Sequence, residues 1–144
     1  MRLWHKDLIP VLPNQQLLGQ WRECCAIARN IAIKGTSNHL LVNRVMNYSP
    51  RHLLLYTLAV CDELESRGFK INRNRFYQWL DEWLGEWEGK LHVVSWQDLF
   101  ADWHNDRYLT QCFYNLQEKR DCGGMTKEEY KLLLQFDIDR RVYK

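Results

Sequence analysis

Residues 12–35, LPNQQLLGQWRECCAIARNIAIKG, decide the fold that this sequence predicts. Asn14 is a strong helix N-cap residue, and Gly35 suits the left-handed conformation that ends a helix. Between them, apolar residues recur at intervals of three and four, which is the period of an amphipathic helix. The main stripe is Leu17, Trp21, Cys24, Ala28 and Ile31. We therefore expect one long helix that buries this stripe.

The opposite face of this helix carries an unusual set of residues. At about 100° per residue, Arg22 and Arg29 stack on each other, with Glu23 beside them and small residues at Gly19 and Ala26. A glycine inside a helix costs about 1 kcal/mol relative to alanine, which suggests a use for the space it leaves. The face is compatible with plain surface and close packing, or with a site of one carboxylate beside two guanidiniums.

The rest of the chain also has helical patterns. Ser49 before Pro50 starts a helix, and Thr126 with Glu129 forms a capping box that starts another. We expect helices over about 39–48, 50–66, from 74 onward, 95–103, 106–119 and 126–137. Residues 1–12 are expected to be an extended arm pinned by its apolar side chains. The sequence therefore predicts a single compact all-α domain over residues 1–144, with a helical, acidic extension from 76 to 144.

Composition narrows the class of protein. Hydrophobic residues make up 46% of 144 residues, enough for a core. No apolar run approaches the roughly 20 residues of a membrane span, and the N-terminus has no signal pattern, so a cytoplasmic location is expected. The five cysteines are odd in number and scattered, which argues against a disulfide framework. Neither cysteines nor histidines have ligand-like spacing, so no metal and no cofactor is expected.

Charge is unevenly distributed along the chain. Residues 1–75 hold 11 Lys/Arg and 5 Asp/Glu, whereas residues 76–144 hold 9 and 13. A basic half next to an acidic half indicates one surface that faces a polyanion. The sequence contains no Gly-rich phosphate loop, GxSxG, HExxH or EF-hand motif.

The N-terminus itself is a candidate reactive group. An α-amino group has an intrinsic pKa of about 7.7–8.0, well below that of lysine. It is therefore partly neutral at physiological pH and can attack an electrophilic carbon to form an imine. An anchored α-amine beside the carboxylate of Glu23 and several arginines would suit imine chemistry on a phosphodiester.

Several of these stretches also resemble a known family. The N-terminal arm with Arg2, the segment QQLLGQWRE (Gln15 to Glu23), His39 and the helix end ELESRGFKIN (Glu63 to Asn72) look like the pyrimidine-dimer DNA glycosylases, the family of phage endonuclease V. The resemblance covers roughly residues 1–75. It implies an all-α DNA-repair enzyme that needs no metal and acts on double-stranded DNA with damaged or abasic sites.

The resemblance also implies roles for individual residues. Family members attack C1′ of the damaged nucleotide with the N-terminal α-amine, release the base and cut the backbone by β-elimination. In this chain the implied catalytic residues are Met1, Arg2 and Glu23. The implied DNA-binding residues are Arg22, Gln15, Gln16, Arg29 and His39. If Met1 is retained, the amine is followed by an arginine as in the family; if it is removed, Arg2 bears the amine.

Two other functions stay open at this point. The first is a nucleic-acid-binding helical module without chemistry, which would use the basic face for phosphate contacts. The second is a protein-interaction module in which Trp79, Trp83 and Trp87 form a groove for a partner. Glu23 favours the enzyme, since a carboxylate on a phosphate-binding face repels the ligand of a pure binder. We expect a monomeric DNA glycosylase with AP-lyase activity on damaged pyrimidines.

Overall fold

The computed structural model describes residues 2–35, 42–85 and 93–142, and the side chains of all of these except 82–85. Within these ranges the chain forms helices and no strand. The elements are η1 (Lys6–Val11), α1 (Asn14–Lys34), η2 (Val42–Asn47), α2 (Pro50–Ser66), α3 (Asn74–Gly85), α4 (Asp106–Asp121) and α5 (Lys127–Val142), where η marks a 3₁₀ helix. The predicted all-α fold class is confirmed.

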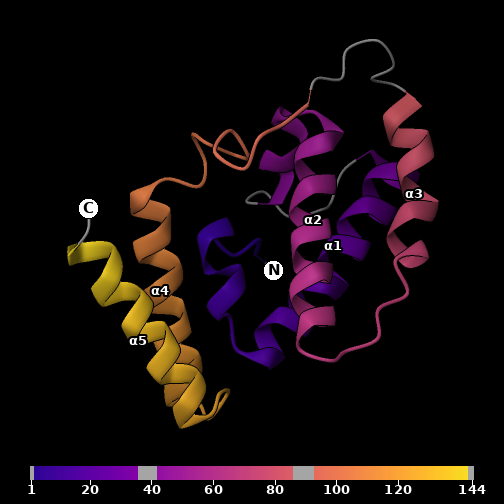
Figure 1. Ribbon diagram of the computed structural model, residues 1–144. Coiled ribbons are helices and arrows are strands. Elements are labelled where there is room, and N and C mark those ends of the chain that lie inside the picture. The colour runs from indigo at the N-terminus through magenta and orange to yellow at the C-terminus, as the bar shows by residue number, and fades with distance from the viewer. Residues whose placement is uncertain (1, 36–41, 86–92, 143–144) are drawn as a thin grey trace.

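The helices form two groups with the N-terminal arm between them. Helices α1, α2 and α3 pack together on one side, and α4 and α5 form a hairpin on the other (Figure 1). The arm, residues 2–13, runs through the space between the two groups. One continuous hydrophobic cluster joins all three parts, with Leu3 and Leu8 from the arm, Leu17 from α1, Leu53 from α2 and Leu116 from α4 fully buried. The arm is therefore part of the core.

Helix α1 largely follows the sequence prediction. Its predicted apolar stripe is buried throughout. Gly35 ends the helix with φ 74°, and its N–H donates to Ile31 O at 2.9 Å. The predicted N-cap is wrong by one residue, because Pro13 occupies the cap and Asn14 is the first helical residue. The exposed N–H of Asn14 is instead satisfied by the Glu129 carboxylate of α5, at 2.7 Å.

The arm is not extended over its whole length, as the sequence had suggested. Residues 6–11 form η1 and contain Pro10. The helix starts where His5 Nδ1 accepts the Asp7 N–H at 3.1 Å. Proline locks φ near the helical value and lacks only an N–H, so a short 3₁₀ turn accommodates it. Residues 2–5 precede η1 without regular secondary structure.

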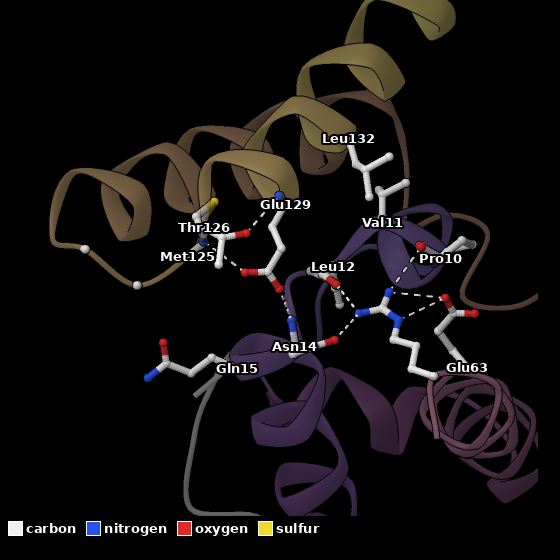
Figure 2. A pocket seen from close by; sticks show the side chains of 13 residues that line it. Pro10, Val11, Leu12, Asn14, Gln15, Glu63, Met125, Thr126, Glu129 and Leu132 are labelled. Atoms are coloured by element: carbon white, nitrogen blue, oxygen red, sulfur yellow. Dashed lines mark hydrogen bonds and ion pairs between the residues drawn. The ribbon is translucent and has the colours of Figure 1, made fainter. Parts of the chain in front are cut away.

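A polar junction fixes the end of η1 to α2. The Arg67 guanidinium, just after α2, donates to Leu12 O at 2.6 Å, to Pro10 O at 3.1 Å and to Asn14 Oδ1 at 2.9 Å. It also pairs with Glu63 at 3.1 Å. These contacts converge in a cavity of about 780 Å³ (Figure 2). Because groups of the protein itself bind the Arg67 guanidinium, we interpret these contacts as structural: they join the end of η1 to α2.

The capping box predicted at the start of α5 is confirmed. Thr126 N–H donates to Glu129 Oε1 at 2.9 Å, and Glu129 N–H donates to Thr126 Oγ1 at 3.1 Å (Figure 2). The helix extends to Val142, beyond the expected end near residue 137. The nearly buried carboxylate of Asp137 pairs with Arg140 at 2.8 Å and Arg141 at 3.1 Å, and this pairing supports the extra turn.

Two expected helices differ from the structure. Residues 96–103 form consecutive turns, and Ser95 Oγ, just before them, accepts the Asp98 N–H at 3.2 Å. Phe100 has φ 48° and its N–H donates to His52 Nδ1 at 3.1 Å, so burial of its ring against α2 displaces regular helix. Of the helix expected over 39–48, residues 42–47 form the 3₁₀ element η2, and residues 39–41 lie outside the described ranges.

Candidate active site

A cleft of about 710 Å³ lies between α1 and the C-terminal half of α4. The arm, α1, and α4 with the turn after it all contribute to its walls. The lining residues are Arg2, Trp4, Gln15, Gln16, Gly19, Gln20, Glu23, Asn115, Lys119, Cys122 and Gly124. Four residues selected from the sequence, Arg2, Gln15, Gln16 and Glu23, thus line the same cleft.

The other selected residues are placed differently. Arg22 and Arg29 are exposed on α1 and do not line the cleft. They lie on the solvent side of the same helix, where they can contact a ligand that extends beyond the cleft. Met1 and His39 lie outside the described residues, so their predicted roles stay predictions.

The α1 wall combines a carboxylate with open space. Glu23 is half-buried and its Oε2 atom is shielded from solvent. At Gly19, an added Cβ would meet no heavy atom within 4 Å, so the wall is recessed there. Gln16 Oε1 is buried and accepts no hydrogen bond from the described residues. An acid–base group, an acceptor and a recess therefore lie within about two turns of one helix.

A buried glutamine ties the arm to α1. Gln20 is 1% exposed. Its Oε1 accepts the Trp4 N–H at 2.7 Å, and its Nε2 donates to Arg2 O at 3.0 Å. One side chain thereby satisfies two backbone groups of the arm. Because an unsatisfied buried amide or carbonyl costs about 1–3 kcal/mol, these bonds fix residues 2–4 against the helix.

Two tyrosines complete the attachment of the arm. The Tyr56 hydroxyl of α2 donates to Trp4 O at 2.6 Å, and the Tyr108 hydroxyl of α4 donates to Leu3 O at 2.5 Å. Burial raises the pKa of both hydroxyls well above the ordinary value, so both keep their protons as donors. Three different helices therefore hold three consecutive peptide units near the start of the chain.

Residues 5 and 6 fasten the arm to the segment before α4. The buried Lys6 ammonium donates to Trp96 O at 2.7 Å and Leu99 O at 2.8 Å. The Lys6 N–H donates to His104 Nδ1 at 2.9 Å, and His5 Nε2 donates to His104 O at 2.9 Å. Burial lowers the pKa of His104 to about 2. The imidazole is therefore neutral at pH 7, and its Nδ1 can accept the Lys6 N–H.

Basic groups come from both walls of the cleft. Arg2 belongs to the arm, where its guanidinium carbon lies 5.8 Å from the Trp4 ring and 6.0 Å from the Tyr108 ring. Lys119 is exposed on the α4 wall. Together with Arg22 beside the cleft, these cations favour an anionic ligand, whereas Glu23 is suited to proton transfer.

No metal chemistry is suggested by the part of the chain that the structure describes. Within residues 2–35, 42–85 and 93–142, no group of three or more His, Cys, Asp or Glu side chains is arranged to hold a metal ion. The same ranges contain no helix long and apolar enough to cross a membrane. The charged side chains that line the cleft are those of Arg2, Glu23 and Lys119.

Comparison with known proteins identifies the family. The family model described as pyrimidine dimer DNA glycosylase matches residues 1–77. The matched segment is more than half of the 144 residues and contains the arm and the α1 wall of the cleft. The chain belongs to this family of DNA-repair glycosylases, as its N-terminal stretches had indicated. No curated protein and no solved structure gives a significant match.

Sequence reasoning missed the groups that hold the arm and the second wall. Gln20 lies three residues after Leu17 and four before Cys24, within the buried stripe of α1. A polar residue at such a position signals a buried hydrogen-bonding role. Asn115 and Lys119 carried no comparable signal, because their place in the same cleft as Glu23 depends on how α4 packs against the arm.

Proposed function

We propose that this protein is a DNA glycosylase with AP-lyase activity on damaged pyrimidines, pyrimidine dimers in particular, and that its N-terminal α-amine is the nucleophile. The attachment of residues 2–4 to three helices, at the edge of a cleft that contains Arg2 and Glu23, carries the proposal. A reactive terminus must be held in place, because a frayed one loses the benefit of orientation.

The proposed reaction begins with the α-amine in its neutral form. The neutral amine attacks C1′ of the damaged nucleotide, the bond from C1′ to the base breaks, and the base leaves with a proton. One amine proton leaves with the base, and the other passes to O4′ as the C1′–O4′ bond breaks, which opens the sugar ring and gives an imine between the amine nitrogen and C1′. The Glu23 carboxylate is suited to take the C2′ proton. The electron pair of the C2′–H bond then forms a C2′=C3′ double bond, the C3′–O bond breaks, and its electrons leave with the phosphate of the cut strand.

The cations have a separate role in this proposal. Arg2 and Lys119, in the cleft, are suited to contact the phosphates that flank the damaged nucleotide, and Arg22 is suited to a phosphate further along the strand. The damaged base would leave the stack before the reaction, at a cost that a lesion reduces. Gly19 provides the recess for a group that enters the cleft.

The protein-interaction alternative gains no support from its tryptophans. Trp79 is half-buried and packs against the hydrophobic core. The side chain of Trp83 and all of Trp87 lie outside the described residues. The groove predicted from the three residues therefore stays a prediction.

The direct test is a comparison of Glu23→Gln with the unmodified protein on abasic and ultraviolet-irradiated duplexes. Loss of the carboxylate should lower strand cleavage at saturating DNA by at least about a hundredfold, the scale of general acid–base catalysis. DNA affinity should stay the same or rise, since a negative charge is removed. Glu128→Gln, at an exposed residue of α5, is the matched control and should cleave normally. Full activity in Glu23→Gln would contradict the assigned role.

A further inference from the structure

The part of the chain beyond the family match holds the start of the arm. Tyr108, in the first turn of α4, donates its hydroxyl to Leu3 O at 2.5 Å. The two residues are 105 positions apart in the sequence. The same tyrosine ring lies 6.0 Å from the guanidinium carbon of Arg2. One side chain from outside residues 1–77 therefore contacts both residue 2 and residue 3.

The ring of Tyr108 is itself fixed by other aromatic rings. Its centroid lies 5.1 Å from that of His104, 5.9 Å from that of Trp103 and 6.3 Å from that of His5. Rings at these separations make favourable contacts. The hydroxyl is thus held on a rigid base, and it can restrain Leu3 O more strongly than a mobile surface tyrosine could.

We infer that Tyr108 is a positioning residue for the reaction, which holds the N-terminal amine at the cleft through Leu3 and Arg2. The inference rests on the proposed function, because it needs the amine to be the nucleophile. Leu3 O is two residues from the amine, so a shift of the Leu3 carbonyl passes directly to the terminus. A misplacement of about 1 Å can cost about a hundredfold in rate.

The inference also gives the C-terminal half of the chain a role. The described hydrogen bonds from Gln20 and Tyr56 hold the arm from the side of the matched segment. Tyr108 holds it from the opposite side, together with the bonds that Lys6 and His5 make to the segment before α4. The matched segment, residues 1–77, therefore depends on α4 to fix the position of its N-terminal residues.

The experiment measures imine formation by borohydride trapping on an abasic duplex, as a function of DNA concentration. Tyr108→Phe removes the hydroxyl and keeps the ring. We expect the trapping rate at saturating DNA to fall by at least about tenfold. The DNA concentration at half-saturation should change by less than about twofold, because no proposed phosphate contact is lost.

Two control variants separate positioning from a general loss of stability. Tyr114→Phe removes a hydroxyl from an exposed residue of the same helix. Thr126→Ala weakens the capping box of α5, outside the cleft and apart from the bonds that hold residues 2–4. Both should trap at the rate of the unmodified protein. If Tyr108→Phe does not fold, Tyr56→Phe removes the bond to Trp4 O and should give the same selective loss of rate.

The outcomes are distinct. A selective loss of trapping rate in Tyr108→Phe supports the inference. A rate equal to that of the unmodified protein overturns it, as does a loss that follows DNA affinity or that Thr126→Ala reproduces. An unmodified protein that binds abasic DNA and forms no adduct contradicts the proposed function itself, before any variant is compared.

Discussion

Acid should weaken the attachment of the arm through His104, and the size of the effect follows from the structure. Burial lowers the pKa of His104 from 6.5 to about 2, with the charges of His5 and Lys6 adding to the shift. His104 Nδ1 accepts the Lys6 N–H, so a proton on this atom would break the bond. The folded protein therefore excludes a proton that the unfolded chain accepts.

The direction and magnitude can be worked out from proton linkage. Below pH 6.5 the unfolded chain binds one more proton at His104 than the folded protein does. The free energy of unfolding therefore decreases as the pH is lowered from about 6.5 to about 2. At pH 4.5 the unfolded imidazole is two pH units below its pKa, which costs about 3 kcal/mol of folding free energy. That loss is a large part of a typical total of about 5–15 kcal/mol.

The assay is urea denaturation of the unmodified protein and of His104→Asn at pH 7 and pH 4.5. Asparagine does not titrate, and its amide oxygen can accept the Lys6 N–H in place of Nδ1. The loss of unfolding free energy between the two pH values should be about 3 kcal/mol smaller in the variant. Between pH 7.5 and 9, where His104 is neutral in both the folded and the unfolded state, the free energy of unfolding should change with pH equally in the two proteins. The reasoning would be refuted if the losses of unfolding free energy between pH 7 and pH 4.5 differed by less than about 1 kcal/mol between the two proteins.

Three further predictions concern single residues. Gly19→Ala should raise the free energy of unfolding by about 1 kcal/mol, because alanine favours the helix and its Cβ meets no neighbour. The same change should slow the cleavage of damaged DNA, because the added methyl group narrows the cleft. Thr126→Ala should lower the free energy of unfolding by about 1 kcal/mol through loss of the capping box, as measured by urea denaturation. Arg22→Ala should weaken DNA binding and reduce the slope of log K against log salt by about 1 in a salt titration.

Each of these predictions has a contradicting result, and the last two also have a control variant. Cleavage by Gly19→Ala that is as fast as that by the unmodified protein, or faster, would show that DNA does not use the recess. Thr126→Ser keeps the hydroxyl and should be as stable as the unmodified protein, whereas equal stability of the alanine variant would mean that the cap contributes nothing. Lys131→Ala, at an exposed residue of α5, should leave the salt slope unchanged. An unchanged slope in Arg22→Ala would exclude a phosphate contact.

The sequence predicted the elements whose signals are local. The apolar period and Gly35 located α1, Ser49 and Pro50 located the start of α2, and Thr126 located the start of α5. In each case the residues that decide the structure lie within one or two turns of it. Half of the cleft, from Arg2 to Glu23, was also within reach of the sequence, because α1 and the arm adjoin each other along the chain.

The elements that sequence reasoning misjudged depend on distant contacts. Residues 95–103 have a helix-like start at Ser95, but the burial of Phe100 against His52 imposes turns. The attachment of Leu3 by Tyr108 spans most of the chain and leaves no local pattern. The α4 wall of the cleft has the same origin, since only the packing of α4 against the arm brings Lys119 into the same cleft as Glu23.

The central claim is that the N-terminal amine forms an imine with abasic or damaged DNA, and adduct mapping tests it most directly. The unmodified protein is incubated with an abasic duplex and borohydride, digested, and the modified peptide is sequenced by mass spectrometry. The account predicts one adduct, on the α-amine of residue 1, which is lost after selective acetylation of that amine. An adduct on a lysine side chain such as that of Lys119, or trapping that survives acetylation, would contradict it.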